Sequence, residues 1–366
     1  MFKINAIVHT IKRIPTATAV VSGLCLLFLV IGAVVGADLR TSISAALAGF
    51  GSWGLFALAM VPTIRAGIGP NFMVPVGVIC GTWAMILALS FGFTAASFLL
   101  VSAIISIFFS CIAGYLCGKI MNTVPGYEMV VAVFTGFAVT FLFSFITINL
   151  PMYLMLPEQF FMGFPVRGFR TPISLAFYDA GYLLAEFLQF EVFGVTVRTG
   201  ELIVIFVAAM FLWIFFKTKA GRGMMAAGSN PAFAKANGID AARVKITAMM
   251  ISMGFCALGF VVMTSAAGML RLYDAPLFMA FPAAAAIFAG GATLRGASIK
   301  NAIIGVLLLQ GFSALSFSVF LEIFQDGYST GVSAGPETIQ IAVRHGVILI
   351  ALIKGGSYVF RREHDL

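Results

Sequence analysis

Ten apolar segments, each near the length of a membrane-spanning helix, dominate this sequence and restrict its fold more than any other feature. A helix that crosses the hydrocarbon core of a bilayer needs about 20 mostly apolar residues. The segments lie near residues 16–37, 43–63, 71–91, 94–117, 127–148, 200–217, 245–268, 277–294, 300–321 and 337–354. We therefore expect an all-α, polytopic integral membrane protein with about ten transmembrane helices.

The composition excludes the soluble alternatives. Hydrophobic residues make up 61% and charged residues 10% of the 366-residue chain, whereas soluble domains contain about 45–50% and about 25%. A soluble fold of this size does not hide so much apolar surface, because even a domain of ~300 residues leaves about a quarter of its surface in water. The five cysteines lie inside apolar runs without a C-x-x-C pair, which is typical of buried thiols rather than of a disulfide framework or metal site. A soluble enzyme and a nucleic-acid binder are excluded.

The basic residues predict the orientation of the spans. With ten spans and a cytoplasmic N-terminus, 16 of the 22 Lys and Arg residues fall in inner segments, five in outer segments, and Arg344 within the last span. Cytoplasmic loops of membrane proteins carry an excess of Lys and Arg, so we expect both termini to be cytoplasmic. The net charge of +8 is then a topology signal and does not indicate a nucleic-acid partner.

Two polar loops predict the organisation of the chain. We expect a first transmembrane half over 1–217, which includes a long periplasmic loop at 149–199, then a cytoplasmic loop at 218–244 and a second transmembrane half at 245–366. Within the outer loop, residues 173–193 are amphipathic enough to predict a helix on the membrane surface. Five spans in each half require that the two halves run in opposite directions across the membrane.

Prolines interrupt the start of the middle span in both halves. The third span begins Pro70-Asn71-Phe72-Met73-Val74-Pro75, and the eighth begins Pro276-Leu277-Phe278-Met279-Ala280-Phe281-Pro282. Irregular backbone at membrane depth is tolerated where it is buried in protein or lines a cavity. Paired interruptions are typical of a transport pathway between inverted repeats; the alternative is a chance match in a chain rich in Phe and Met.

Four residues in the spans are candidate pathway residues. Asn71 and Phe72 lie at the interrupted start of the third span, Gln310 lies near the middle of the ninth, and Arg344 lies eight residues into the last. Polar groups inside a membrane are expensive and often mark a substrate pathway. The alternative is that they form hydrogen bonds between helices and only hold the bundle together.

The chain offers little chemistry of its own. The acidic residue nearest to a span interior is Glu128 at the start of the fifth span, so no proton or sodium relay is predicted. No phosphate-binding loop G-x-x-x-x-G-K-[ST] and no H-E-x-x-H is present. We therefore expect a non-catalytic protein that binds no cofactor or metal. The energy for transport would then come from a partner, unless the protein is a passive channel.

The cytoplasmic loop contains a predicted short helix. Asn230 or Ser229 is suited to cap a helix that begins with Pro231, and Gly238 is suited to end it. We expect about two helical turns between two glycine hinges. The segment is either a solvated connector or a docking helix that inserts into a groove of a cytoplasmic subunit.

This loop resembles the conserved cytoplasmic loop of ABC importer permeases of the branched-chain amino acid and ribose (simple sugar) type. The residues that carry the resemblance are Gly221, Arg222, Ala227, Gly228, Asn230, Ala234, Gly238 and Ile239. Similarity continues at residues 286–296, which read A-I-F-A-G-G-A-T-L-R-G, and at Arg344-His345-Gly346. The first half differs, because residues 67–77 lack the Asp and Ser of the family's G-I-D-L-S-V-G motif, and this leaves the substrate open.

The resemblance implies a division of labour between subunits. Two cytoplasmic ATP-binding subunits would bind ATP and Mg²⁺, an extracytoplasmic binding protein would deliver the solute, and a second permease, either the same chain or a paralogue, would complete a dimer in the lipid of a bacterial inner membrane. Gly228, Asn230, Ala234, Gly238 and Ile239 would couple ATP hydrolysis to transport. The expected cargo is a small polar solute: a simple sugar first, a nucleoside or branched-chain amino acid next. The rival from another class is a stand-alone channel or ion-coupled carrier.

Overall fold

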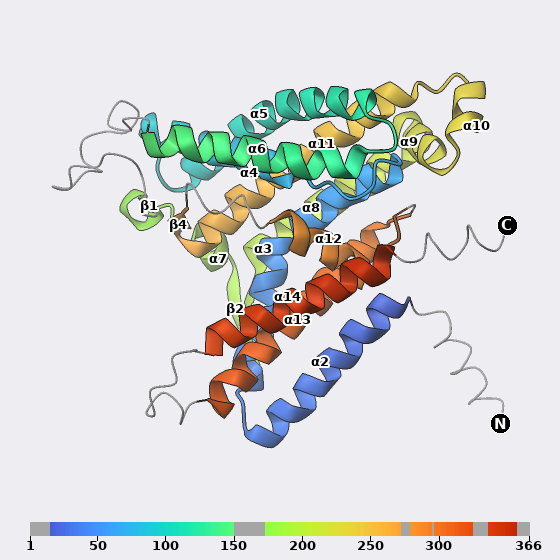
Figure 1. Cartoon of the computed structure of the whole chain (residues 1–366). Helices are drawn as coiled ribbons and strands as arrows, with labels where there is room; N and C mark the ends of the chain where they lie inside the picture. The colour runs from blue at the N-terminus through green and yellow to red at the C-terminus, as the bar shows by residue number, and fades with distance from the viewer. Residues whose placement is uncertain (1–14, 150–172, 272–278, 295, 325–335, 357–366) are drawn as a thin grey trace, which may run out of the picture.

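The chain folds into a bundle of long apolar helices (Figure 1). A computed structural model describes residues 15–149, 173–271, 279–294, 296–324 and 336–356. Its α-helices are α2 (Thr16–Val35), α3 (Leu39–Arg65), α4 (Val74–Ser90), α5 (Ala95–Thr123), α6 (Glu128–Asn149), α7 (Leu183–Glu186), α8 (Thr199–Lys217), α9 (Lys219–Ser229), α10 (Pro231–Ala236), α11 (Ala241–Ala267), α12 (Ala280–Ala289), α13 (Ile299–Ile323) and α14 (Pro336–Gly356).

The predicted all-α membrane fold is confirmed. Seven of the described helices are long and apolar enough to cross a membrane, and three shorter apolar helices lie within α4, α12 and α14. Each of the ten predicted segments coincides with one of these ten helices. The third and eighth segments are shorter than predicted, because α4 begins only at Val74 and α12 covers only Ala280–Ala289.

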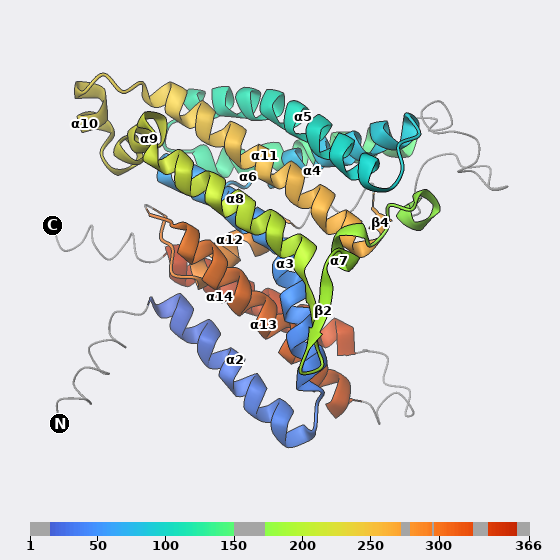
Figure 2. The same ribbon diagram turned by 180° about the vertical axis from the view of Figure 1, so that it is seen from behind.

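The two halves pack as equivalent sets of helices. α3 and α11 lie together at the centre, α11 packs against α5 as α3 packs against α13, and α4 lies on α5 as α12 lies on α13. The pairs α4–α6 and α12–α14 are also equivalent. One difference breaks the correspondence: the first helix of the chain, α2, packs along α13, whereas its counterpart α8 lies along α3 (Figure 2).

Small residues allow the closest of these crossings. A Cβ built on Gly114 or Gly118 of α5 would lie 2.6 Å from the Cα of Met250 or Ile246 of α11, respectively. Helices in a membrane associate through such close approach of backbones rather than through a hydrophobic driving force. Glycine at these positions therefore sets the distance between α5 and α11.

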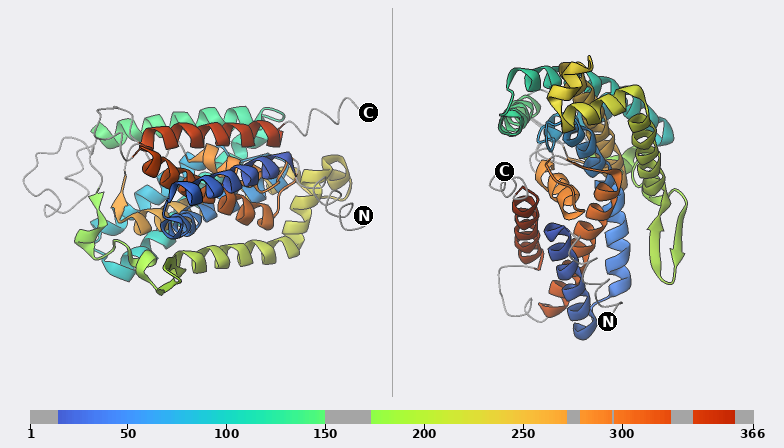
Figure 3. Two further views of the ribbon diagram at one scale, coloured as in Figure 1. Left: turned by 90° about the horizontal axis from the view of Figure 1, so that it is seen from below. Right: turned by 90° about the vertical axis from the view of Figure 1, so that its right-hand side faces the viewer.

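The ends of the bundle carry different structures. α9 and α10 lie at the end where α2 begins and α14 ends, while the short strands lie at the opposite end (Figure 1). α6 and α14 lie on one face of the molecule, and α8 lies on the opposite face (Figure 3). The segment 218–244 and the short strands therefore lie at opposite ends of the bundle.

The predicted surface helix over 173–193 is wrong. The segment instead contains β1 (Ile173–Ser174), a 3₁₀ turn, the single helical turn α7 and β2 (Gln189–Val192). β1 pairs with β4 (Met269–Leu270), and β2 forms a hairpin with β3 (Val195–Arg198). Phe193 and Gly194 both have positive φ (53° and 79°), as a two-residue hairpin turn requires. The alternation of apolar residues was compatible with a helix, but the turn reverses the chain.

Candidate functional site: a coupling segment and a cavity

α9 and α10, called here the coupling segment (residues 219–236), extend from the end of the bundle. The predicted cap of α10 is confirmed: the side chain of Asn230 accepts a hydrogen bond from the N–H of Phe233 at 3.0 Å, and Pro231 is the first helical residue. Gly238 has a φ of +73° and follows the helix, as predicted. The N–H of Ile239 donates to the carbonyl of Ala234 at 2.9 Å, which ties the following chain back onto α10.

The glycines before α10 are not the hinge that the sequence predicted. Gly221, Gly223 and Gly228 lie inside the helix α9, whose first turn is capped by the hydroxyl of Thr218. Gly228 instead permits a close contact. A Cβ at this position would lie 1.9 Å from the carbonyl oxygen of Arg65, the last residue of α3. No side chain fits there, so α9 lies directly against the backbone at the end of α3.

Arg65 joins four parts of the molecule at this point. Its Nε donates a hydrogen bond to the carbonyl of Ala297 at 2.7 Å, and its Nη1 lies 2.9 Å from the sulfur of Met225 in α9. Its guanidinium carbon lies 4.3 Å from the ring centre of Phe216 in α8, a favourable cation–π arrangement. Sequence reasoning counted Arg65 only as a topology signal, because its partners are 151 or more positions away in the chain.

The coupling segment also presents one large apolar side chain. Both side chains belong to α10: that of Ala234 is buried, while that of Phe233 is 59% exposed. An exposed aromatic at the tip of a molecule often marks a contact with another protein. The sequence patterns singled out glycines and small residues here and missed Phe233.

The irregular chain between α3 and α4, residues 66–73, is called here the pre-α4 segment and is closely packed. The Nδ2 of Asn71 donates to the hydroxyl of Ser252 in α11 at 2.8 Å, and its Oδ1 accepts from the N–H of Met73 at 2.8 Å. The ring of Phe72 lies 5.5 Å from that of Phe281, centre to centre, around a space of only about 10 Å³. Asn71, one of the predicted pathway residues, is 1% exposed and ties the interrupted chain to α11.

The other two predicted pathway residues, Gln310 and Arg344, line a common cavity of about 680 Å³. The cavity lies between α3, α11, α12, α13 and α14, and Asn71 and Phe72 are not part of its lining. Met279 and Pro282, called here the α12 start, form one side of it. The remaining lining residues are Trp53, Phe260, Met263, Thr264, Ala267, Met269, Arg271, Leu309, Ser313, Ile341, His345 and Ile348.

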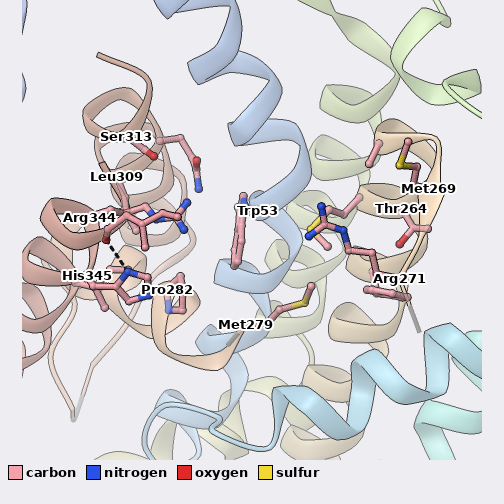
Figure 4. A pocket seen from close by; sticks show the side chains of 16 residues that line it. Trp53, Thr264, Met269, Arg271, Met279, Pro282, Leu309, Ser313, Arg344 and His345 are labelled. Carbon is pink, nitrogen blue, oxygen red and sulfur yellow. Dashed lines mark hydrogen bonds between the residues drawn. The ribbon is translucent and has the colours of Figure 1, made fainter. Parts of the chain in front are cut away.

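Sequence reasoning missed most of the cavity's polar lining. In Figure 4, the indole of Trp53 lies between the side chains of Arg344 and Arg271, which extend toward it from opposite sides. Thr264 and His345 also line the cavity. Trp53 lies in an apolar span and Arg271 lies just after one. The neighbouring sequence does not show whether such residues face a cavity or the lipid, so the position of Trp53 between two arginines could not be predicted from the sequence.

The acidic residues of the bundle are also arranged differently from the prediction. Glu128 forms an ion pair with Lys245 of α11 at 2.7 Å. Glu201 in the first turn of α8 is fully buried; its Oε2 accepts a hydrogen bond from the hydroxyl of Ser52 in α3 at 3.3 Å, and its Oε1 lies 3.9 Å from the Nη1 of Arg198. The expectation that Glu128 is the acid nearest a span interior is therefore wrong, because the packing of α8 on α3 buries Glu201.

Comparison with known proteins places these features in context. A family model described as "Branched-chain amino acid transport system / permease component" matches residues 42–352. A solved structure assigned to the metal-chelate type of ABC transporters, in an inward-facing conformation, is 13% identical with a TM-score of 0.44, and the match covers 92% of this chain and 99% of that one. Comparison with curated protein sequences gives no match.

Proposed function

The chain belongs to the family of branched-chain amino acid transport permeases and is a permease component of an ABC transporter, and from this premise we propose that it moves a small polar solute inward at the expense of ATP. ATP and Mg²⁺ are bound by partner subunits, and an extracytoplasmic binding protein delivers the solute. The first candidate cargo is a simple sugar, and nucleosides and branched-chain amino acids come next. The complex is a dimer of permeases in a bacterial inner membrane.

The observation that carries this proposal is the backbone contact between the coupling segment and α3. Because α9 lies against Arg65 without an intervening side chain, a displacement of α9 must displace the end of α3 and the pre-α4 segment that follows it. Tightly packed elements transmit movement because their interiors are dense and have few voids. Arg65 extends the connection to the chain before α13 through the carbonyl of Ala297.

Phe233 gives the partner subunit a point of attachment. It is 59% exposed on α10, while Ala234 and the turn at Gly238 hold the helix in place beneath it. A short helix with one exposed aromatic fits a groove on a partner as an anchor residue. ATP-driven closure of the two partner subunits would then pull on α10 and, through α9, on α3.

The experiment is reconstitution of the permease with its ATP-binding subunits and binding protein in proteoliposomes, with labelled ribose, adenosine and leucine as probes. Uptake of one of them is expected only when hydrolysable ATP is present on the side of the ATP-binding subunits. Uptake that continues without ATP contradicts the proposal and supports the channel or carrier.

A matched pair of variants tests the attachment. Phe233→Ala is expected to reduce co-purification of the ATP-binding subunits, whereas Phe193→Ala, which removes an aromatic that is 93% exposed in the hairpin at the other end of the bundle, is expected to leave it unchanged. Equal co-purification in both variants would contradict docking through α10.

A further inference from the structure

The cavity beside the α12 start contains cationic groups that have no counterion among the described residues. Arg271 and Arg344 both line it, yet the ion pairs within the described part of the chain involve only Arg198, Arg243 and Lys245 as bases. The Nε of Arg344 is buried and has no hydrogen-bond partner there. A guanidinium stays charged in a protein, and a buried charge without a partner is costly. A negatively charged group beside Arg344 would supply the missing partner of its buried Nε, and Arg271, which is exposed, adds a second positive charge to the lining of the same cavity.

From this deficit we propose that the cavity binds a small solute that carries a carboxylate or a phosphate, with the anionic group at Arg344 and the rest of the solute extending along Trp53 toward Arg271. The proposal deepens the proposed function, because it rests on this chain being a transport permease and assigns its cargo a negative charge. A guanidinium presents several N–H donors in a plane and binds carboxylate or phosphate oxygens through paired hydrogen bonds.

Both arginines line the same cavity, on either side of Trp53. In Figure 4, the two side chains extend from α14 and from the chain after β4 toward the same space, with the indole of Trp53 between them. His345 adds a further polar group: its Nδ1 lies 2.7 Å from the carbonyl of Ile341, which can only accept, so Nδ1 carries the proton. In the neutral imidazole, the other ring nitrogen of His345 is then an acceptor for a hydroxyl of the solute.

The rest of the lining indicates a solute with an apolar face and hydroxyl groups. Trp53 offers a flat aromatic surface, while Gln310 and Thr264 supply an amide and a hydroxyl. The volume of about 680 Å³ falls within the ~300–1,000 Å³ typical of small-molecule sites. A sugar acid or a sugar phosphate combines these features with the required charge, and it remains within the class of cargo that the coupling arrangement serves.

The same chemistry could come from the headgroup of an anionic phospholipid. Both sources provide a phosphate to the arginines, but only a free solute also uses the amide, the hydroxyl and the indole. The experiment therefore includes both sources as separate arms.

The experiment measures binding to the purified full chain in a neutral detergent by isothermal titration calorimetry. Glucuronate, glucose 6-phosphate and glucose are the soluble probes, and phosphatidylglycerol in nanodiscs is the lipid probe. We expect one or both sugar anions to bind at least about 10-fold more tightly than glucose, because hydrogen bonds to charged groups are among the stronger ones. The carboxylate and phosphate arms show which anionic group the site prefers.

Variants connect the binding to the two arginines. Arg344→Gln and Arg271→Gln are each expected to weaken binding of the sugar anion about 10-fold or more, whereas Arg344→Lys, which keeps the charge, loses less. Arg222→Gln is the control, because it removes an exposed base of α9 at the other end of the bundle. Size-exclusion profiles and helical circular dichroism establish that each variant is folded, and Arg344→Lys keeps the test decisive if Arg344→Gln does not fold.

Several results overturn the proposal: glucose binding as tightly as the anions, no binding of any soluble probe at millimolar concentration, unchanged affinity in both Gln variants, or binding of phosphatidylglycerol alone. These results are separate from a failure of the proposed function. Uptake without ATP would overturn the importer and leave the anion affinities intact, whereas loss of the anion preference would leave ATP dependence intact.

Discussion

The pre-α4 segment and the α12 start are corresponding interruptions of the two inverted halves, yet one is filled and the other is open. At the pre-α4 segment, Asn71 bonds to Ser252 and Phe72 packs on Phe281 around about 10 Å³ of space. At the α12 start, Met279 and Pro282 border a cavity of about 680 Å³. Similar local sequence therefore leads to two different environments.

The two interruptions differ in what they contact. The two interruptions meet where Phe72 packs on Phe281. The pre-α4 segment also contacts the coupling segment, because Gly67 lies against Gly228, whereas the α12 start borders the cavity. Close packing at the first suits the transmission of force from α9. Open space beside the second suits a solute. The predictions below test this difference. Each compares a substitution at or near one interruption with a matched substitution elsewhere.

The largest effect is expected at the contact beneath the pre-α4 segment. Gly228→Leu places a side chain where a Cβ would already lie 1.9 Å from the carbonyl oxygen of Arg65, so α9 must move away from α3. ATP-driven uptake in proteoliposomes should fall to background. Gly223→Leu is the matched control in the same helix, because the nearest atom to its Cβ, in Ile239, is at an ordinary 3.7 Å; normal uptake by Gly228→Leu contradicts transmission through this contact.

The second prediction concerns a substitution that fills the cavity at the α12 start. Met279→Trp puts a larger side chain into the cavity, where there is room for it, so the protein should remain folded while uptake falls at least about 10-fold, as expected for a blocked site whose solute loses several contacts. Phe72→Trp makes the equivalent enlargement at the filled pre-α4 segment. It should instead lower the free energy of unfolding by about 1–3 kcal/mol, the usual cost of overpacking. Thermal unfolding and uptake are measured on both variants, and the same response from both would show that the two interruptions do not differ.

A third prediction compares polar groups at the two interruptions. Asn71→Leu removes the acceptor of the Met73 N–H in a buried position, and an unsatisfied buried donor costs about 1–3 kcal/mol. Gln310→Leu removes an amide that lines the cavity, where water can replace its contacts, so its effect on stability should stay below about 1 kcal/mol. Thermal unfolding in detergent distinguishes the two variants. A larger loss of stability for Gln310→Leu than for Asn71→Leu would contradict close packing at the pre-α4 segment and open space at the α12 start.

The sequence predicted what depends on local pattern and missed what depends on which helices meet. Hydropathy located all ten apolar helices, and capping chemistry located α10, because both act over one or a few turns. The pathway residues were only partly brought together, since Gln310 and Arg344 share the cavity while Asn71 does not line it. Trp53 joins the cavity only because α3 faces α13 and α11, and nothing in the neighbouring sequence records that packing.

The hairpin was missed for a related reason. Residues 189–198 form strands around a turn of two residues with positive φ, of which only Gly194 is of a type that favours it. Phe193 adopts the same region although it has a Cβ, so its identity does not signal a turn. The buried acid was missed because Glu201 is only the second residue of the predicted span 200–217, where a carboxylate can reach the membrane surface, whereas the packing of α8 against Gly51 and Ser52 encloses it.

The smallest effect is expected for a substitution of Glu201. The same substitution distinguishes an ATP-driven importer from an ion-coupled carrier. Glu201 is the buried carboxyl that would serve an ion-coupled carrier, yet it lies at the α3–α8 contact and lines neither the cavity nor the small space at the pre-α4 segment. Glu201→Gln keeps the shape and the hydrogen bond to Ser52 while removing the charge. If energy enters through the coupling segment, ATP-driven uptake should change less than about 2-fold, since the amide keeps the shape of the carboxyl and Arg198, whose side chain is 38% exposed, stays solvated without its partner. Uptake is measured with and without a proton gradient, and Ser52→Ala, which removes only the hydrogen-bond partner, is the control. Abolished uptake in Glu201→Gln, together with normal uptake in Ser52→Ala, would show that the charge itself takes part in transport and would favour the carrier.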